Sequence, residues 1–409
     1  MLRLLRSDLQ RGLLIAGLVL PMGQSAYADE QDTVNFTLGT NFLYNSNVFR
    51  TPDTSGPQAG FTTKADIITN NNAGVTIAKS YSQQRFQLDS NYSMRQYDTF
   101  SRLDANTLNY HGAWLWALTP HVTGSFNLTQ NQAEIPFTDT TGETTRNTRT
   151  STSRTMSLDG WISGKWHVIA GLGQTESKTE QAILSTPATK SQYMEAGLRY
   201  VATSQNSITL RHRVTPVELT NFTLDPNSLT ETNYKDIETE IKVSWKLSGQ
   251  STIDGRLARK SRRNEHFAQR DFSGISGNLN YAWKPTAKLQ FTFGASRNVS
   301  AFGAVGNATQ NSSFRLDQTL TVGAAWSTSA RTSMNLSLSR QQSDFLGPVF
   351  GNTGAARVDE LTNAQLGMSW GVRRYVTLSA SVGRDFRASN AAGFQFSNNS
   401  ASLGAQLNF

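Results

Sequence analysis

The polar segments of this 409-residue chain carry charged side chains at alternating positions. Guanidinium, ammonium and carboxylate groups spaced in this way lie on one face of a strand, where they can hydrogen-bond hydroxyl, carboxylate or phosphate groups of a saccharide. The candidate residues are Arg85, Asp89, Arg95, Arg211, Arg213, Glu240, Lys242, Arg256, Arg315 and Asp317. For each single residue we favour the plainer alternative, pairing with a charge on a neighbouring strand. The set as a whole predicts a polar inner wall along which a solute passes, with arginines such as Arg85 and Arg95 attracting acidic groups.

Patterns for catalysis or metal binding are weak. The five histidines are scattered at His111, His121, His167, His212 and His266, without the spacing of a metal site. No distinctive serine context supports a Ser-His-Asp triad. The chain has no cysteine and therefore no disulfide. We predict a protein that is not an enzyme and that holds no cofactor and no metal.

Apolar and polar residues alternate in segments of about ten residues along the chain. In one such segment Leu289, Phe291 and Phe293 share one parity and Lys288, Gln290 and Thr292 the other. Such alternation predicts strands with one apolar face. Counting the segments gives about eighteen strands, with sixteen as the alternative. The predicted fold class is all-β: a transmembrane antiparallel up-and-down β-barrel, forming one domain over 29–409.

Short and long connections alternate along the chain. Short corners such as ALTP, KPTA and GVRR follow every second strand, and long polar stretches at 45–63, 130–152, 176–190 and 341–357 follow the others. Short periplasmic turns and long extracellular loops are typical of outer-membrane barrels. The apolar residues of 341–354 predict that this loop folds inward as a constriction or packs on neighbouring loops. The basic segment 260–270 could contact lipopolysaccharide phosphates or an acidic polymer at the mouth.

Tryptophan recurs beside the predicted short turns at intervals of about 40 residues. Aromatic rings settle where hydrocarbon meets headgroup, so the series predicts an aromatic girdle at the periplasmic boundary: Trp116, Trp161, Trp245, Trp283, Trp326 and Trp370. A β-propeller also repeats at about 40–45 residues. Its blades need four short strands, however, whereas each repeat here contains two long ones.

Residues 1–28 have the features of a cleaved signal peptide. Arg3, Arg6 and Arg11 precede an apolar stretch at 13–20, and small residues lead to an Ala-Tyr-Ala cleavage signal at 26–28. The apolar stretch is shorter than the roughly 20 residues of a membrane-spanning helix. We therefore expect an exported chain.

The end of the chain and its composition agree with a barrel. The last strand alternates and ends in Phe409, which resembles the terminal signal read by the barrel-assembly machinery. The hydrophobic fraction is 37% and the formal net charge +8, without the clustered basic helix of a nucleic-acid-binding protein. We expect the outer membrane of a Gram-negative bacterium as its location, membrane lipid as a partner and no nucleic acid.

Two segments resemble a known family. NFLYNSNVFRTPD (41–53) and KSRRNEHFAQRDFSGISGNLNYAWKPTAKLQFTFGASRNVS (260–300) are similar to the EpsL-like outer-membrane barrels encoded with exopolysaccharide and exosortase systems, grouped as type 2 β-barrel porins. The resemblance implies a role in exopolysaccharide biosynthesis or export, with periplasmic or inner-membrane export components as partners. It transfers no catalytic residue. Phe49, Arg50 and Pro52 are expected to order the first long loop against the barrel mouth.

These observations predict an outer-membrane barrel whose polar lumen passes exopolysaccharide to the cell surface. A general or sugar-uptake porin is the alternative within the same class. A surface-exposed structural or adhesive barrel with a closed lumen is the alternative from another class. Conductance of the refolded barrel separates these possibilities.

Overall fold

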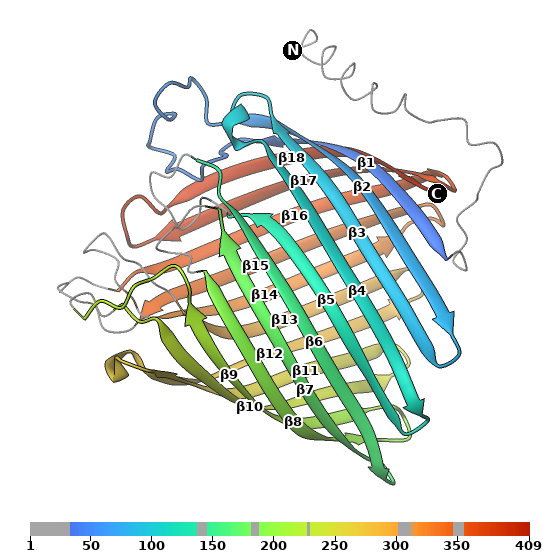
Figure 1. Cartoon of the computed structure of the whole chain (residues 1–409). Helices are drawn as coiled ribbons and strands as arrows, with labels where there is room; N and C mark the ends of the chain where they lie inside the picture. The colour runs from blue at the N-terminus through green and yellow to red at the C-terminus, as the bar shows by residue number, and fades with distance from the viewer. Residues whose placement is uncertain are drawn as a thin grey trace.

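The computed structural model describes residues 33–135, 137, 145–180, 188–226, 230–301, 312, 314–346 and 356–409. Their strands are β1 Val34–Asn45, β2 Asp66–Tyr81, β3 Gln84–Tyr97, β4 Ala105–Thr119, β5 Val122–Glu134, β6 Thr148–Ser163, β7 Trp166–Thr179, β8 Thr189–Val201, β9 Ser207–Leu219, β10 Asn233–Ser248, β11 Ser251–Asn264, β12 Phe272–Thr286, β13 Leu289–Ala301, β14 Phe314–Ser327, β15 Thr332–Leu346, β16 Val358–Arg373, β17 Val376–Ser389 and β18 Phe396–Asn408. They form one eighteen-stranded sheet (Figure 1). The predicted signal peptide lies outside the described residues.

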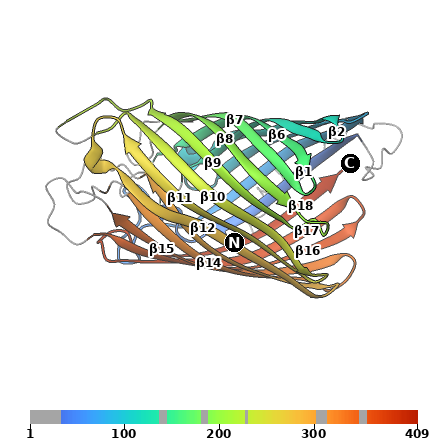
Figure 2. The same ribbon diagram turned by 90° about the horizontal axis from the view of Figure 1, so that it is seen from below.

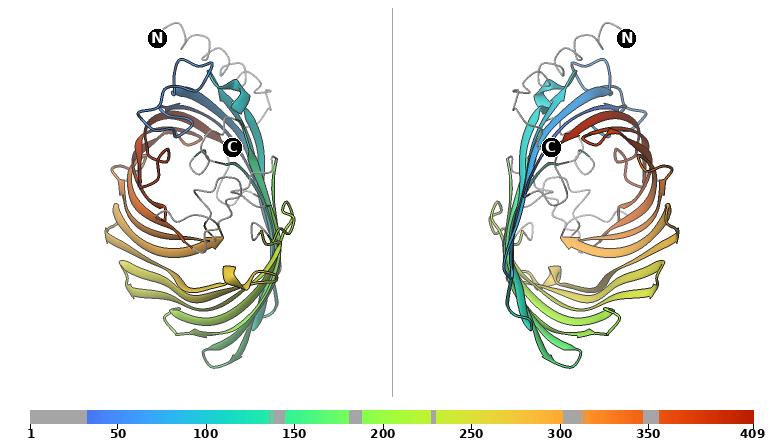
Figure 3. Two further views of the ribbon diagram at one scale, coloured as in Figure 1. Left: turned by 90° about the vertical axis from the view of Figure 1, so that its left-hand side faces the viewer. Right: turned by 90° about the vertical axis from the view of Figure 1, so that its right-hand side faces the viewer.

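The sheet closes because its first strand pairs with both the second and the last. β1 pairs antiparallel with β2 along its whole length, and with β18 from Thr37↔Asn408 to Asn45↔Ser400. Figure 2 shows the tilted strands from below, and Figure 3 shows them end-on as an oval ring. Closure pairs both edges of every described strand, so the sheet has no open edge. The prediction of a closed barrel with eighteen strands is confirmed.

The polarity of the barrel is inverted relative to a soluble protein. Large apolar side chains are exposed on the outer face, among them Phe36 at 53%, Leu257 at 60% and Leu403 at 65%. Residues of the opposite parity face inward and are mostly Asn, Ser, Thr, Gln and Gly. A closed ladder satisfies the backbone polar groups within the protein, as hydrocarbon surroundings require. The apolar outer face is thus suited to lipid, and the inner face to water.

Short turns and long loops lie at opposite ends of the barrel. Turns of two to five residues follow the even-numbered strands from β2 to β16. The described part of the loop end carries longer connections such as 46–65 and 98–104, and two one-turn 3₁₀ helices, η1 Ser101–Leu103 and η2 Ala268–Arg270. Among the described residues, no helix is long and apolar enough to span a membrane.

Several loops are shorter than the sequence predicted. β5 and β6 extend into the predicted loop 130–152, β7 and β8 into 176–190, and β15 into 341–357. β11 continues to Asn264, so the first half of the predicted basic loop 260–270 is strand. Backbone pairing does not depend on the side chains. The strands therefore continue where both faces are polar and the alternation in the sequence has ended.

Candidate functional site: the inner wall and its loop-end mouth

The inner wall is built mainly from short, neutral, polar side chains. Hydroxyl groups on adjacent strands hydrogen-bond each other, with oxygen–oxygen distances of 2.7 Å between Ser333 and Ser369 and 2.8 Å between Ser381 and Ser402. Each hydroxyl keeps further donor or acceptor capacity. The wall therefore offers many weak hydrogen-bonding positions of similar strength to a solute in the lumen.

Glycines on the inner face let neighbouring side chains lie flat against the wall. A Cβ atom added at Gly39 would lie 2.4 Å from Asn72 Oδ1, and one added at Gly323 would lie 2.4 Å from Thr292 Oγ1. Asn72 and Thr292 therefore occupy the space beside the glycines instead of standing into the lumen. This arrangement keeps the passage wide.

Charge is concentrated on one arc of the inner wall, which we call the β8–β11 charge cluster: Glu195, Arg211, Arg213, Glu238, Glu240, Lys242 and Arg256. Glu240 lies at its centre with 1% of its side chain exposed. Its carboxylate is 2.6 Å from Arg211 Nη2 and 3.6 Å from Lys242 Nζ, and it contacts Arg256 Nε. The register of β8 to β11 thus brings together five of the predicted wall residues, Arg211, Arg213, Glu240, Lys242 and Arg256.

The remaining cations of the cluster also have carboxylate partners. Arg211 and Arg213 lie 2.9 Å and 2.5 Å from Glu195, and Arg256 lies 2.5 Å from Glu238. Arg211 and Arg256 each contact a second carboxylate, that of Glu240. Each of the four cations of this arc therefore contacts one or two of its three carboxylates, which leaves the arc with a formal charge of +1.

Most of the other predicted wall residues are paired as well. Arg95 Nη1 lies 2.7 Å from Glu134 Oε2, and Arg315 Nε lies 3.0 Å from Asp317 Oδ2. Asp317 also accepts a hydrogen bond of 2.5 Å from the Ser343 hydroxyl. These pairs lie apart from the β8–β11 charge cluster, so the predicted residues do not form a single site.

Asp89 and Arg85 are the two predicted wall residues nearest the short-turn end of β3. Asp89 lies 3.7 Å from His111 Nδ1 and accepts a hydrogen bond of 2.8 Å from Gln87. Arg85 is exposed and has no hydrogen-bond or ion-pair partner within the described residues. Of the arginines expected to attract acidic groups, Arg85 alone lacks a carboxylate partner in this part of the chain. The pairing of the others weakens that interpretation.

The loop of residues 46–65 is bound to the inner side of the barrel at the loop end. The Asn47 side chain, in a residue only 3% exposed, donates from Nδ2 to the carbonyl groups of Thr51 at 2.7 Å and Ser397 at 3.0 Å. The Asn47 backbone N–H donates to Asn398 Oδ1 at 3.0 Å. This asparagine therefore ties the segment that resembles the family motif to β18.

Arg50 and Phe49 extend this anchor in two directions. Arg50 has a left-handed backbone with a φ angle of 53°, and its Nη2 lies 3.1 Å from Asp385 of β17. Phe49 is 5% exposed and packs edge-on against Phe100, with ring centroids 4.9 Å apart. The same apolar cluster includes Ile68 on the inner face of β2. The loop thus has its own small core at the mouth, which the sequence indicated only through its motif.

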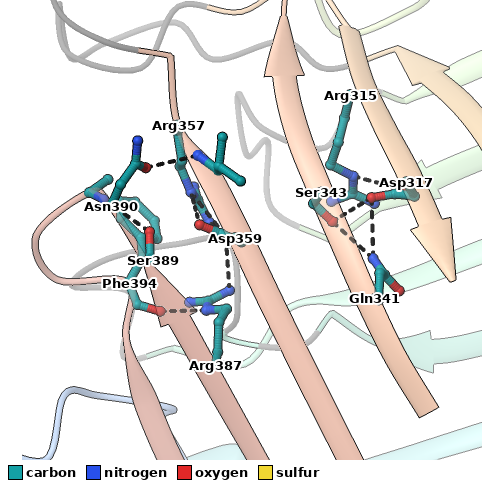
Figure 4. A network of polar contacts seen from close by, with 12 residues as sticks. Arg315, Asp317, Gln341, Ser343, Arg357, Asp359, Arg387, Ser389, Asn390 and Phe394 are labelled. Atoms are coloured by element: carbon teal, nitrogen blue, oxygen red, sulfur yellow. Dashed lines mark hydrogen bonds and ion pairs between the residues drawn. The ribbon is translucent and has the colours of Figure 1, made fainter. Parts of the chain in front are cut away.

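A second network at this end was missed by the sequence reasoning. Arg357 contacts Asp359, and its guanidinium lies 3.5 Å from the ring centroid of Phe394 (Figure 4). Arg387 lies 3.8 Å from Asp359 and donates to the Phe394 carbonyl. Phe345 covers the other side of Arg357 at 4.2 Å. The inward parity of these charged residues is the signal that could have found them.

Phe345 bears on the prediction for the segment 341–354. This residue does face inward and is 4% exposed, but it does so as part of β15 and not from a loop. Figure 4 shows its strand beside the Asp317 network. The rest of the segment, from 347 onward, lies outside the described residues.

A buried carboxylate joins two other loops at this end. Glu231, 2% exposed, accepts hydrogen bonds from the backbone N–H groups of His266 at 2.9 Å and Phe267 at 3.2 Å, and lies 2.8 Å from His266 Nδ1. Burial by itself would raise the pKa of Glu231, but hydrogen bonds from His266 and from backbone amides outweigh it and lower the pKa to about 2. The charged carboxylate therefore links the segment 230–232 before β10 to 265–271 after β11.

Five of the six predicted girdle residues face outward beside the short turns: Trp116, Trp245, Trp283, Trp326 and Trp370. Trp161 differs, because it pairs with His167, whose ring lies 2.7 Å from the inward-facing Asp159. Trp161 therefore has the inward parity of Asp159, and the next residue, Ile162, has the outward parity. Trp116 lies against the outer face of Gly124 and is 9% exposed.

Phe409 lies where the wall closes. Its backbone N–H donates to the Phe36 carbonyl at 2.8 Å, and its carbonyl accepts from the Phe36 N–H at 2.9 Å. The role of Phe409 as an assembly signal remains a prediction. No group of three His, Asp or Glu side chains in the described part of the chain is arranged to hold a metal ion.

The closed sheet and its polar interior define a porin-like β-barrel with the fold of outer-membrane porins. Pseudomonas aeruginosa OpdK, solved with vanillate, is similar with a TM-score of 0.51 and 9% identity over 92% of this chain and 99% of OpdK. Pseudomonas aeruginosa OccK2 (OpdF), solved in complex with glucuronate, has a TM-score of 0.51 and 10% identity over 93% of this chain and 99% of OccK2. At these identities the similarity concerns the fold.

The family model described as "Putative beta-barrel porin 2" matches residues 239–409. This match covers the C-terminal half of the barrel, from β10 to β18, and supports the porin-like class. No curated protein shows a match to the chain.

Proposed function

We propose that this protein is an outer-membrane channel that conducts a saccharide chain, and that its solute is an exopolysaccharide passing from the periplasm to the cell surface. The observation that carries the proposal is the inner wall of neutral amides and hydroxyls, whose charged side chains are mostly paired with one another. A sugar hydroxyl can exchange hydrogen bonds between such positions at little net cost. Conduction requires binding that is weak enough at each position for the solute to leave.

The pairing of the wall charges refines the type of polymer. Arg95, Arg211 and Arg256 are engaged by carboxylates of the wall, and binding an acidic sugar there would require displacing those partners. We therefore favour a polymer with few charges over a strongly acidic one. The resemblance of 41–53 to exopolysaccharide-associated barrels supports an exopolysaccharide as the solute. Periplasmic or inner-membrane export components would supply the driving force.

Uptake of small sugars or sugar acids is the second candidate. It is favoured by the fold similarity to OccK2, which was solved with glucuronate, and by the loop 46–65, which binds over the inner wall at the mouth. In this case the channel would select short solutes at its mouth, and no polymer would enter.

Planar-bilayer conductance of the refolded protein tests the proposal. We expect an open channel that is blocked by neutral dextran more strongly than by alginate of the same length. Block by glucose or glucuronate without block by either polymer would favour uptake. Absence of conductance would contradict both candidates and favour the closed, adhesive barrel.

A matched pair of variants places the block in the lumen. Ser381→Tyr stands on the inner face of β17, whereas Leu378→Tyr stands on its outer face, where Leu378 is 39% exposed. The inner variant should lower conductance and change the block by dextran, and the outer variant should change neither. Equal behaviour of the two variants would show that the polymer acts outside the lumen.

A further inference from the structure

Four arginines occupy equivalent positions on the outer face of the barrel. Arg259 of β11, Arg297 of β13, Arg340 of β15 and Arg384 of β17 each stand eight residues after the first residue of their strand. All four are exposed, and their parity is that of the lipid-facing residues Leu257, Ala295, Leu338 and Val382. We call this set the arginine belt.

The belt lies in the C-terminal half of the barrel, and in the other half Arg154 of β6 faces outward opposite Gln174. The corresponding outward positions of β3, β5 and β7 are occupied by Tyr92, Gln130 and Gln174. Eight residues of strand tilted at roughly 40° rise about 20 Å from the short-turn end. The belt therefore lies near the upper edge of an apolar band about 25 Å tall, whose lower edge bears the tryptophans. A lipid-facing charge is least costly close to such an interface.

Most members of the belt lack a protein partner. Arg340 Nη2 lies 2.8 Å from Glu360 Oε2, with 66% of the arginine side chain still exposed. Within the described residues, Arg259, Arg297 and Arg384 make no hydrogen bond or ion pair through their side chains. This differs from the inner wall, where nearly all predicted cations are neutralised. An anion from outside the chain is therefore the natural partner of the belt.

An apolar groove lies directly below two of these arginines. It has a volume of about 970 Å³ and its lining includes Ile241, Leu257, Leu279 and Leu320, with Arg297 and Arg340 at its rim. Gly255 and Gly277 face outward within it, and Arg297 stands opposite Gly277 on the neighbouring strand. Because these two glycines have no side chain, the backbone of β11 and β12 forms the floor of the groove. An elongated apolar chain fits such a groove, and its headgroup would lie at the level of the arginines.

We propose that the outer face of β11–β15 binds a lipid whose headgroup carries phosphate. Its acyl chains occupy the groove, and a phosphate lies between Arg297 and Arg340. The two Cα atoms are separated by one intervening strand and a two-residue offset, which corresponds to about 12 Å. Two long guanidinium side chains can converge on one phosphate from that distance, Arg297 with a pair of N–H donors and Arg340 with the donors that Glu360 does not engage. The bound lipid would cover the apolar groove of this face.

Native mass spectrometry of the full-length, refolded protein tests this site with lipid A as the probe. We expect the bisphosphorylated form to bind at least ten-fold more tightly than its dephosphorylated form. The double variant Arg297→Gln/Arg340→Gln should lose at least ten-fold in affinity for the bisphosphorylated form. Arg154→Gln, which removes an exposed outward arginine of β6 far from the groove, should change affinity less than two-fold.

Gly255→Leu tests the contribution of the groove separately from that of the arginines. A Cβ atom added there meets only Leu279 Cδ1 at 3.5 Å and Asn278 O at 3.9 Å, so the backbone at this position accepts a side chain that points into the groove. We expect it to weaken binding by filling the floor while the preference for phosphate persists. Equal binding by the double variant and the native chain would overturn the proposal. So would dimerisation of the native chain that the double variant loses, because the groove would then be a contact between two copies.

Discussion

The carboxylate of Glu240 lies between Arg211 and Arg256, so Glu240→Gln removes a charge that both guanidinium groups contact. Breaking a buried ion pair from one side costs about 3–5 kcal/mol. Arg211 keeps Glu195 and Arg256 keeps Glu238 as partners, which places the expected loss at the lower end. We expect the free energy of unfolding to fall by about 3 kcal/mol.

The same substitution should change ion selectivity. A unit charge roughly 10 Å from an ion in a water-filled lumen shifts its energy by about 0.4 kcal/mol, which is about two-fold in local concentration. Removing the negative charge of Glu240 lowers the cation concentration and raises the anion concentration about two-fold each, so the ratio of anion to cation permeability should shift about four-fold toward anions. The shift should shrink as salt concentration rises, because mobile ions screen the charge.

Two assays read these effects separately. Denaturant unfolding in lipid vesicles, followed by tryptophan fluorescence, reports the stability change, and the reversal potential under a KCl gradient reports selectivity. Glu176→Gln is the matched control, because Glu176 pairs with Lys178 on the exposed outer face, 2.8 Å away. The control should change neither quantity. If Glu240→Gln also changes neither, the electrostatic description of the β8–β11 charge cluster is refuted.

Three further predictions concern the mouth and the outer face. Asn47→Ala removes the side-chain hydrogen bonds that hold the first long loop, so limited proteolysis of that loop should accelerate about ten-fold. Thr54→Ala, at an exposed position of the same loop, should have no effect. Equal proteolysis rates for Asn47→Ala and the native chain would contradict the anchor. The lowered pKa of Glu231 means that its contribution to stability is complete above its usual pKa of 4.5 and is lost as pH falls toward 2. Protection from hydrogen exchange in the two segments that Glu231 links should therefore fall over this range. Unchanged protection at pH 2 would refute the link. Gly124→Ala would place a Cβ 2.2 Å from Trp116 and should lower stability by about 1–3 kcal/mol in denaturant unfolding; an unchanged midpoint would show that the ring moves aside freely.

The strand pattern shows which features can be predicted from sequence. Leu289, Phe291 and Phe293 were expected on one face, and they do lie on the outer face of β13. Alternation is a local property, since successive side chains of a strand point to opposite sides. The prediction for Trp161 was wrong because it relied on the distance from the turn and not on the parity of the strand. Its distance from the turn agrees with the other tryptophans, but its parity does not.

Strand ends were harder to predict. β15 continues through Phe345 to Leu346, and β11 through Arg262 to Asn264, although their last residues no longer alternate. Pairing there depends on the neighbouring strand and on inner contacts such as that between Arg262 and Asp236 at 2.7 Å. A single segment contains neither piece of information.

By itself, the sequence determined the barrel class with about eighteen strands, the face of each strand that is apolar, and the alternation of turns and loops. These features depend on residues close together in the chain. Only the tertiary structure decided which charges neutralise one another and how the mouth is held. Asn47 meets Asn398 across 351 positions of sequence, because closure of the barrel brings the first strand beside the last. Register and closure act between distant segments, so they determine the electrostatics of the wall without leaving a local signal.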